Sequence, residues 1–456
     1  MKLFGLKQAT VGHTAVGLWR HPECQAHRYK ELGYWLETAK TLESGYFDGL
    51  FIADALGVLD TFGGTIDLPL RHGVQTPCID PLLAISAMAT VTQHLGFAVT
   101  ISTTYEQPYL LARKFTTLDH LTGGRIGWNI VTSALDSAAR NLGLNRQIPH
   151  DERYVRADDF LTAAYRLWED SWDDDAVRFD REGSLFADPN KVSAVNHAGP
   201  YYRIQDAFLC EPSPQRTPVI FQAGTSRAGQ EFAAKHAEAV FVSVPTPTLA
   251  RRLVDSIRGL AASFGRDPRS ILFLALVAIV PGRDRITAEN KHAEYLRFIS
   301  PEGHLARHSA LFQLDLSHVD LDTPLEHVET EGIRGVLELF TGSDNGRRWT
   351  PREIGQSLGV AAGGPTFVGS PVDIVDTMLQ WTQQGDLDGF NILDPMPLRS
   401  YPDFIDLVLP ELQRRGLVRT KYQGGTFREN LFGPGQTHLR GDHPARKILQ
   451  RGPAPA

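Results

Sequence analysis

Eight short apolar segments recur along the chain, and stretches with helical periodicity separate them. The segments are Leu3–Leu6, Gly49–Ala53, Gly96–Ile101, Ile126–Val131, Val219–Gln222, Ala239–Val242, Ile271–Val280 and Gly389–Leu393. Most are apolar at consecutive positions, as expected for strands that are covered on both faces. Helical stretches lie between them at Tyr29–Leu42, Pro81–Thr92, Arg156–Trp168 and Leu249–Ala262. Alternating strands and helices predict an α/β fold with parallel strands, and eight strands favour a closed (β/α)8 TIM barrel over an open sheet.

The chain is longer than such a barrel requires. It has 456 residues, whereas about 250 are typical of the fold. Two segments, near residues 169–209 and 283–367, are too long for plain connections and are expected to form insertions over the carboxyl-terminal mouth. Residues 1–432 are therefore predicted to form a single barrel domain. Residues 433–456, rich in Gly, Pro and basic side chains, are predicted to be an extended or disordered arm.

Composition argues against several classes of protein. The formal net charge of −7 gives no basic surface for nucleic acid or for an anionic membrane. Three cysteines without C-x-x-C spacing suggest neither a disulfide framework nor a zinc site, and the pair His304 and His308 lacks the glutamate of a zinc-protease helix. We expect no metal. The amino terminus lacks a signal-peptide core, and no apolar run approaches the ~20 residues of a membrane helix, so a cytoplasmic protein is expected.

Polar side chains gather where the predicted strands end, which is where barrels carry their chemistry. Asp54 directly follows the second strand, and Thr100 and Tyr105 lie at the end of the third. An N-cap role for Asp54 and simple strand propensity for Thr and Tyr are alternatives. Asn129 lies inside the fourth apolar strand, where an amide is costly to bury without partners. Asn129 therefore indicates a site.

A second polar group follows the fourth and fifth strands. His150 and Tyr154 are four residues apart and share a helix face, so both can donate to a phosphate or a ring, although an aromatic packing pair is an alternative. Gly224, Thr225 and Ser226 precede a helical pattern, which suits anion binding, although Ser and Thr are also common N-caps. Neither a Walker-type phosphate loop nor a strand-anchored G-x-G-x-x-G occurs, which disfavours nucleotide triphosphatases and Rossmann enzymes.

Three sequence blocks lie around these residues: Gly-Gly-Arg-Ile-Gly-Trp-Asn-Ile-Val-Thr-Ser at 123–133, Ala-Ala-Arg-Asn-Leu-Gly at 138–143, and His-Asp-Glu-Arg-Tyr-x-Arg-Ala-Asp-Asp-Phe at 150–160. Together they resemble the nitrilotriacetate and dibenzothiophene-sulfone monooxygenase family, a branch of the bacterial luciferase-like flavin enzymes. Further segments that resemble this family are Trp19–His21, Phe47–Asp54, Phe186–Pro189, Gln222–Ser226, Asp388–Phe390 and Arg415–Arg428. The resemblance extends to about Leu431.

The resemblance implies a luciferase-like barrel that binds reduced FMN at the carboxyl ends of its strands and uses O2 as co-substrate. By position, Asp54, Thr100 and Asn129 would surround the isoalloxazine ring. The ribityl phosphate would be held by His150, Tyr154 and Ser226, with backbone donors at Gly224 and Thr225. A separate NAD(P)H-dependent flavin reductase would supply FMNH2 by diffusion, and the oxygenase would be a homodimer or homotetramer.

The expected reaction is the transfer of one oxygen atom to a small organic substrate. Asn129 is a candidate for holding O2 near the ring, and His13 and His308 are candidate acid–base residues, although a lone surface histidine is the common alternative. The rings of Trp19, Phe62, Tyr105 and Phe241 favour an apolar substrate such as a sulfone, thioether or halogenated aromatic, with C–S, C–N or C–halogen cleavage.

Other functions stay open from the sequence. Arg20, Arg71 and Arg307 are compatible with an aminopolycarboxylate substrate of the nitrilotriacetate type. A deazaflavin-dependent dehydrogenase on the same barrel is a second alternative, and a non-catalytic flavin-binding relative is a third.

Overall fold

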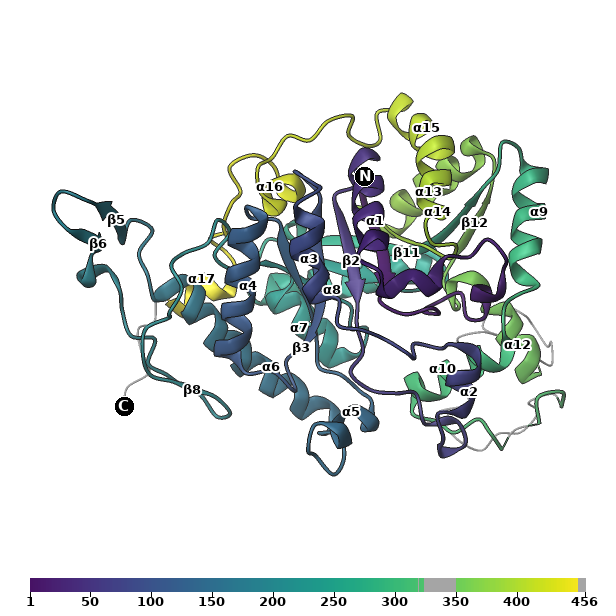
Figure 1. The fold of residues 1–456 in the computed structure, drawn as a ribbon, viewed down its shortest axis with the longest axis horizontal. Coiled ribbons are helices and arrows are strands. Elements are labelled where there is room, and N and C mark those ends of the chain that lie inside the picture. The colour runs from purple at the N-terminus through teal and green to yellow at the C-terminus, as the bar shows by residue number, and fades with distance from the viewer. Residues whose placement is uncertain (319, 324–349, 450–456) are drawn as a thin grey trace.

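Eight parallel strands close into a barrel, and helices surround it (Figure 1). The computed structural model describes residues 1–318, 320–323 and 350–449. The barrel strands are β1 (Lys2–Gln8), β2 (Gly49–Ala53), β3 (Gly96–Ser102), β4 (Ile126–Val131), β9 (Val219–Gln222), β10 (Ala239–Val242), β11 (Leu272–Pro281) and β13 (Gly389–Leu393). Each pairs in parallel with the next, and β13 pairs with β1 to close the barrel. The predicted (β/α)8 fold and all eight predicted strands are confirmed.

A ninth strand lies outside the barrel. β12 (Thr366–Gly369) pairs in parallel with the second half of β11, from Ala278 to Pro281. The sequence analysis placed most of this segment in an insertion, because four residues with one large apolar side chain give little periodicity. The pairing extends β11 beyond the barrel rim and anchors the end of the second insertion.

The two faces of the strands pack in different layers. Inward residues, including Phe4, Phe221 and Phe241, form one buried cluster inside the barrel, and the outward residues pack against the helices. The side chain of Phe427 closes the amino-terminal end of this interior. A Cβ atom at Gly96 would lie 2.2 Å from the Phe427 ring, so glycine is required there. The barrel is therefore a filled core, and ligands have access only at its carboxyl-terminal mouth.

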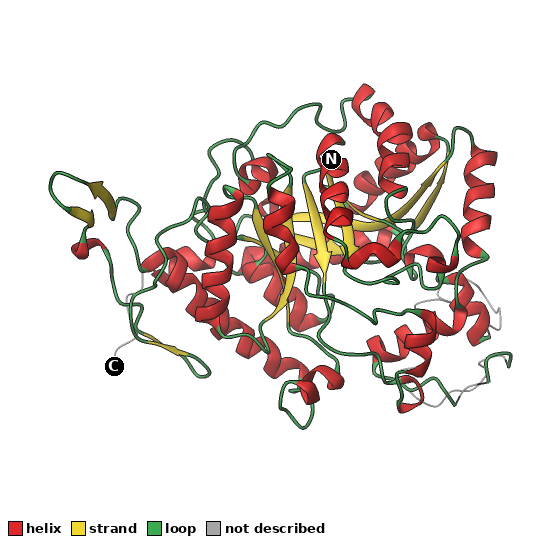
Figure 2. Ribbon diagram, viewed as in Figure 1, coloured by secondary structure: helices red, strands yellow, loops and turns green. Residues whose placement is uncertain are grey.

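The outer ring consists of helices that follow the strands (Figure 2). The longer ones are α1 (Leu32–Ser44), α3 (Leu82–Ala89), α4 (Pro108–Thr122), α6 (His150–Tyr165), α7 (Arg227–His236), α8 (Pro247–Ser263) and α13 (Pro371–Gly385). Shorter ones are α2 (Asp67–His72), α5 (Asp136–Asn141), α14 (Ser400–Asp403), α15 (Leu409–Arg414) and α16 (Phe427–Phe432). The four predicted helical stretches coincide with α1, α3, α6 and α8. No helix in the described part of the chain is long and apolar enough to span a membrane.

The first insertion contains two short hairpins, β5 (Val177–Asp180) with β6 (Leu185–Ala187) and β7 (His197–Ala198) with β8 (Arg203–Ile204). It leaves the barrel after α6, and the β5–β6 hairpin extends away from the body (Figure 1). His197 is 2.9 Å from Asp159 of α6, and Phe208 packs edge-on against Tyr109 of α4. The insertion near 169–209 thus packs along α4 and α6, and it reaches the carboxyl end of β3 at Tyr202, whose hydroxyl donates a 3.4 Å hydrogen bond to the carbonyl of Thr103.

The second insertion covers the mouth, in the position expected for it. Its described helices are α9 (Arg285–Leu296), α10 (Pro301–Phe312) and α12 (Pro351–Ser357), and residues 324–349 of the expected insertion lie outside the described residues. Before α10, the backbone of Ser300 donates to the carbonyl of Val16 in the loop after β1. After α10, the side chain of Gln313 donates to the carbonyl of Ala134 in the loop after β4. The helix therefore bridges loops that follow two different barrel strands.

The segment after Phe432 packs on the barrel. It contains α17 (Pro444–Leu449), which contacts α6 and α7. The buried ring of His443 lies 2.9 Å from the carbonyl oxygen of His236, and Ala445 is fully buried. Residues 433–449 therefore do not form the extended or disordered arm that composition suggested, and residues 450–456 lie outside the described residues. A few buried residues hold this segment on the barrel, although its average composition is polar.

Candidate active site

A pocket of about 390 Å³ opens at the carboxyl ends of β2, β3 and β4. Three of the predicted site residues, Asp54, Thr100 and Tyr105, line it. The structure thus brings these three together from different strand ends. The other walls include Leu56, Cys78, Ile79, Leu82, Ile101, Ser102, Ser133 and Leu142. Three charged side chains, Asp80, Glu106 and Lys114, also line it, so the pocket has an apolar and a polar part.

Asn129 is the polar residue inside the barrel next to this pocket. Its Cα faces those of Thr100 on β3 and Phe221 on β9, and its Nδ2 donates a 2.9 Å hydrogen bond to Thr100 Oγ1. Asn129 is 2% exposed, and its Oδ1 has no hydrogen-bond partner among the described residues. A buried amide oxygen without a partner is costly. It is therefore positioned for a donor that comes from a ligand.

The carboxyl group of Asp54 lies in a strongly dehydrated position. Its Oδ1 accepts a 2.8 Å hydrogen bond from the backbone N–H of Ala55, and the Sγ of Cys78 is 3.8 Å away. The pKa of Asp54 is raised to about 6. Burial is the main cause and the neighbouring Asp80 adds to it, whereas the hydrogen bond from the Ala55 N–H opposes it. Burial also raises the pKa of the Cys78 thiol to about 12, and the carboxylate of Asp54 adds to this. Asp54 can therefore change its protonation state near neutral pH, whereas Cys78 remains a thiol.

A second group of predicted residues meets at the start of α7. Ser226 is the N-cap of α7, where its Oγ accepts a 3.1 Å hydrogen bond from the Gly229 N–H, so the N-cap interpretation of this residue is correct. The Nε2 of His150, the first residue of α6, lies 3.3 Å from the same Oγ. The ring of Tyr154 packs edge-on against His150 at 5.2 Å between centroids. The helix end also presents unpaired backbone N–H groups, which attract anions.

The backbone before α7 approaches its neighbours closely. A Cβ atom at Gly224 would lie 2.5 Å from Gln222 Nε2 and 3.0 Å from the Tyr154 hydroxyl. Only glycine fits without movement there. Thr225 is exposed, and its carbonyl accepts a 2.7 Å hydrogen bond from Gln230.

The two polar groups are joined through α6. Arg153 lies one residue before Tyr154 on this helix, and its Nη1 is 3.4 Å from the carbonyl oxygen of Thr132, directly after β4. The hydroxyl of Thr104 donates a 2.6 Å hydrogen bond to the same carbonyl. The loops after β3 and β4 are therefore fixed to the helix that carries His150. Asp54, Thr100, Asn129, His150 and Ser226 consequently belong to one mouth, although they come from five sequence regions.

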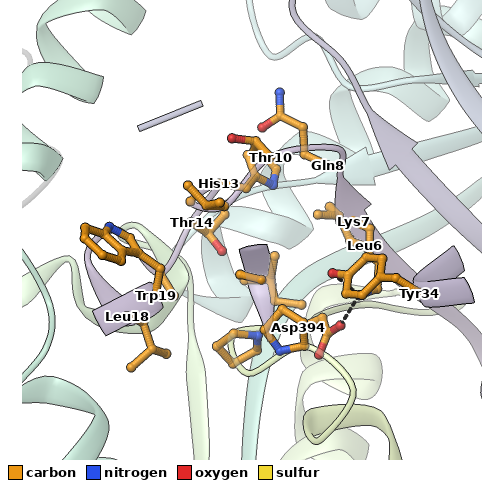
Figure 3. A pocket seen from close by; sticks show the side chains of 17 residues that line it. Leu6, Lys7, Gln8, Thr10, His13, Thr14, Leu18, Trp19, Tyr34 and Asp394 are labelled. Carbon is orange, nitrogen blue, oxygen red and sulfur yellow. Dashed lines mark hydrogen bonds and ion pairs between the residues drawn. The ribbon is translucent and has the colours of Figure 1, made fainter. Parts of the chain in front are cut away.

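His13 and Trp19 lie elsewhere in the mouth, at the ends of β1 and β13. They line a cavity of about 40 Å³, together with Gln8 and Thr10 (Figure 3). Burial, with a smaller contribution from the charge of Arg307, lowers the pKa of His13 to about 3. Trp19 is 40% exposed, and its Nε1 donates a 2.8 Å hydrogen bond to the carbonyl of His72. The His13 imidazole is thus neutral at physiological pH.

His308 belongs to α10 and contacts backbone. Its Nδ1 is 2.8 Å from the carbonyl oxygen of His304, whose own Nε2 is 3.0 Å from the carbonyl oxygen of Gly359. Burial lowers the pKa of His308 to about 4, with a further contribution from Arg307. His308 is therefore also neutral near pH 7. Among the described residues, no three His, Cys, Asp or Glu side chains are grouped as a metal site requires.

The aromatic residues predicted for substrate binding are not brought together. Phe62 packs with Leu305 and Leu316 beside α10, whereas Tyr105 lines the 390 Å³ pocket and accepts a 2.8 Å hydrogen bond from Gln147. Phe241 lies inside the barrel, where its ring stacks on that of Phe51 with 4.2 Å between centroids. Phe241 is a core residue below the mouth, because its position on β10 points inward.

The sequence analysis missed a buried charged cluster next to His13. The Nζ of Lys7 lies 2.6 Å from Asp394 Oδ2 and 2.6 Å from the Tyr34 hydroxyl, and all three side chains are almost fully buried. Burial opposes the charge of Lys7, but Asp394 and Tyr34 outweigh it and raise the lysine pKa. Lys7 and Asp394 are 387 residues apart, so only the closure of the barrel brings them together. The available signal was Lys7 directly after the predicted apolar strand Leu3–Leu6, where barrel strands end.

The comparisons with known proteins agree with this geometry. Residues 14–387 match the family model for luciferase-like monooxygenases. The dimethyl-sulfide monooxygenase of Hyphomicrobium sulfonivorans is 44% identical over 435 residues, which cover 95% of this chain and 91% of that protein. The dibenzothiophene-sulfone monooxygenase of Rhodococcus erythropolis is 38% identical over 438 residues, 94% of this chain and 96% of that one.

The fold comparison extends over nearly the whole chain. A crystal structure of a riboflavin lyase with modified FMN and its substrate riboflavin superimposes with a TM-score of 0.88 at 34% identity, covering 98% of this chain and 99% of that one. The resemblance identified from the blocks around Asn129 and His150 is thereby confirmed. The chain belongs to the luciferase-like monooxygenase family and is an oxygenase of the flavin-dependent kind.

Proposed function

We propose that this protein uses reduced FMN and O2 to oxygenate a small organosulfur compound, a thioether or a sulfone, with FMNH2 supplied by a separate flavin reductase. The observation that carries the proposal is one mouth with two unlike ends. One end has the buried Oδ1 of Asn129, unpartnered among the described residues, beside a pocket of about 390 Å³ with aliphatic and polar walls. The other has the Ser226-capped start of α7 beside His150. A flavin ring with a phosphate tail needs both.

The residues present fit FMN in their chemistry. Oδ1 of Asn129 accepts hydrogen bonds only, which suits an N–H of the isoalloxazine ring. The hydroxyl of Ser226, the imidazole of His150 and the first turn of α7 are donors that suit a phosphate dianion. Gly224 allows the backbone there to come close to a bound group. Asn129, Thr100 and Asp54 would therefore hold the ring, and Ser226, His150 and Tyr154 the phosphate.

Bound reduced FMN supplies the reaction with O2 and the delivery of one oxygen atom. The chain contributes orientation and exclusion of water. Thr100 holds the amide of Asn129 through the 2.9 Å hydrogen bond from its Nδ2. α10 crosses the mouth and, with Leu59 and Val74, shields it from solvent. Asp54, with its pKa of about 6, can accept or return a proton at the pocket wall.

The proposed substrate class rests on the pocket lining and on two relatives. Leu56, Ile79, Leu82 and Ile101 line the 390 Å³ pocket, which suits a small molecule with an apolar reacting part. The relatives described above are named for oxygenating dimethyl sulfide and dibenzothiophene sulfone. Both substrates present sulfur to the oxygen donor. We therefore expect thioethers and sulfones to be better substrates than haloarenes and aminopolycarboxylates.

The partner reductase is proposed from what the chain lacks in sequence. No strand-anchored G-x-G-x-x-G is present for a nicotinamide cofactor. Reduced flavin must then come from another protein. We propose that it arrives by diffusion and that the oxygenase is a homodimer or homotetramer.

The test is oxygen transfer with photoreduced FMN, which needs no reductase. Purified protein, FMNH2 and 18O2 are mixed with dimethyl sulfide, dibenzothiophene sulfone, a chloroarene or nitrilotriacetate, and products are analysed by mass spectrometry. We expect 18O in the organosulfur products. Formation of H2O2 alone with every compound would contradict the proposal.

A further inference from the structure

The segment between β4 and α6 connects the two ends of the proposed flavin site. It begins directly after the strand that carries Asn129 and ends at His150, the first residue of α6. Asn129 belongs to the proposed ring end, and His150 Nε2 lies 3.3 Å from Ser226 Oγ at the proposed phosphate end. α5 and the loop after it lie at the edge of the molecule, beside α6 (Figure 1). A flavin that occupies both ends must therefore lie next to this segment.

The first part of this segment is fixed to a neighbouring loop. Ser137 on α5 donates a 2.7 Å hydrogen bond from its hydroxyl to the carbonyl of Val58, in the loop after β2. Arg140, also on α5, forms an ion pair with Asp60 of the same loop. Residues 137–139 are buried. α5 is thus held firmly at the rim of the mouth.

The segment is fixed a second time at Gln147. Its Nε2 donates a 2.8 Å hydrogen bond to the hydroxyl of Tyr105, which lines the 390 Å³ pocket, and its backbone N–H lies 2.9 Å from Asp136 Oδ1. Residues 141–146 lie between the two anchored parts and are all exposed. Within the described residues, their side chains have no hydrogen bond or ion pair. They can therefore change position without breaking a side-chain interaction of that kind.

Two leucines in residues 141–146 are exposed although they are apolar. Leu142 is 49% exposed and lines the 390 Å³ pocket, and Leu144 is 38% exposed. Gly143 between them has a φ of 88°, which glycine adopts readily. Full burial of a leucine contributes about 1.5–3 kcal/mol. A ring bound in the pocket would give both side chains an apolar surface on which to pack.

Arg146 is the charged residue at the other end of the same stretch. Its side chain is exposed and has no carboxylate partner within the described residues. It lies four residues before His150, which is at most about 14 Å of extended chain, so its guanidinium can reach the phosphate end. A guanidinium binds phosphate through bidentate, charge-assisted hydrogen bonds. The stretch thus has apolar side chains near the ring end and a cation near the phosphate end.

We propose that residues 141–146 form a strap that closes over bound FMN, with Leu142 and Leu144 packed on the ring and Arg146 bound to the phosphate. The exposed loop is the open form of this strap. Because reduced flavin arrives and oxidised flavin leaves by diffusion, the site must open in every turnover and exclude water in between. This inference rests on the proposed function for the identity of the cofactor.

Hydrogen exchange tests the closure without catalysis. Oxidised FMN is added to the wild-type protein at a saturating concentration, and amide exchange is followed by mass spectrometry. Residues 141–146 should exchange at least about tenfold more slowly with FMN, because closure orders a stretch that is open in the free protein. The β5–β6 hairpin, which extends away from the body, is the internal reference and should not change. Unchanged exchange of residues 141–146 at saturating FMN overturns the inference.

Two variants separate the two contacts, with affinities measured by calorimetry. Leu144→Ser should lower the affinities for FMN and riboflavin alike, by about 3- to 10-fold, because packing on the ring is lost. Arg146→Met should lower the affinity for FMN by about tenfold or more and leave that for riboflavin unchanged, since riboflavin has no phosphate. Both side chains are exposed, so Tm of the flavin-free protein should stay the same.

Matched controls and outcomes complete the test. Leu185→Ser, at a side chain on β6 that is 37% exposed, and Arg297→Met, at an exposed arginine after α9, should bind both flavins as the wild type does. Wild-type affinity for FMN in Leu144→Ser or Arg146→Met overturns the inference. So does an Arg146→Met variant that loses FMN and riboflavin affinity equally. Failure of the proposed function is seen separately, as the absence of 18O transfer by a protein whose strap is protected by FMN, and a protein that binds no flavin overturns both.

Discussion

Asn129 donates a 2.9 Å hydrogen bond to Thr100 across two adjacent barrel strands, and this bond leaves Oδ1 of Asn129 buried and without a partner among the described residues. The two Cα atoms are direct neighbours in the register of β3 and β4. The hydrogen bond to Thr100 uses one N–H of the amide, so that the acceptor Oδ1 is left for a ligand.

The free acceptor can be tested with Asn129→Leu. The change removes the unpartnered acceptor but also the donor to the buried Thr100 hydroxyl, so it should lower stability by no more than about 1–3 kcal/mol. Affinity for reduced FMN, measured by anaerobic fluorescence titration, should fall by about tenfold or more, which corresponds to about 1.4 kcal/mol. As a control, Thr116→Val on α4 also removes a buried polar atom without a partner, a hydroxyl, and should leave this affinity unchanged. An Asn129→Leu variant with wild-type affinity would remove Asn129 from the proposed flavin site.

The phosphate end can be tested with Ser226→Ala. The wild-type protein is expected to bind FMN more tightly than riboflavin, and the variant should lose about 10- to 100-fold of that preference, since hydrogen bonds to charged groups contribute about 1.5–3 kcal/mol. Loss of the N-cap also costs about 1 kcal/mol of stability. Ser370→Ala removes the N-cap of α13 in the same way and controls for the stability effect. Equal losses of FMN preference in the two variants would indicate a purely structural role for Ser226.

Asp54 gives a pH dependence with a defined sign. Its pKa is about 6 in the folded protein, against the ordinary value of 3.8 for an exposed aspartate. The folded state therefore binds the proton more tightly, and folding stability falls as the pH rises from about 4 to about 6. Asp54→Asn should thus stabilise the flavin-free protein at pH 7.5, by at most about 2–3 kcal/mol, and should have little effect at pH 4. Thermal unfolding at both pH values measures this, and a gain that is the same at both would contradict the shifted pKa.

The floor of the barrel depends on a buried ion pair. Arg428 Nε and Nη2 lie 2.8 Å and 3.0 Å from the two carboxylate oxygens of Glu238. Glu238→Gln leaves the buried guanidinium without its counter-ion and should cost about 3–5 kcal/mol, seen as a loss of Tm. Asp255→Asn breaks the exposed pair with Arg251 on α8 and should cost less than about 1 kcal/mol. Comparable losses in the two variants would mean that Arg428 is compensated by other groups.

The sequence determined the barrel and the candidates at its strand ends. Strands buried on both faces must be apolar at consecutive positions, so the eight strands could be recognised locally, and a polar Asn129 among them stood out for the same reason. Ser226 was singled out from a helix start and His150 from its spacing to Tyr154 on one helix face, both local signals, and the structure places the side chains of His150 and Ser226 3.3 Å apart.

Only the tertiary structure decided the rest. Lys7 meets Asp394 because the first and last strands pair. The segment after Phe432 packs through a few buried contacts that composition does not reveal. Local patterns specify which face of an element is buried. Which distant groups meet there depends on chain closure, and that is a property of the whole fold.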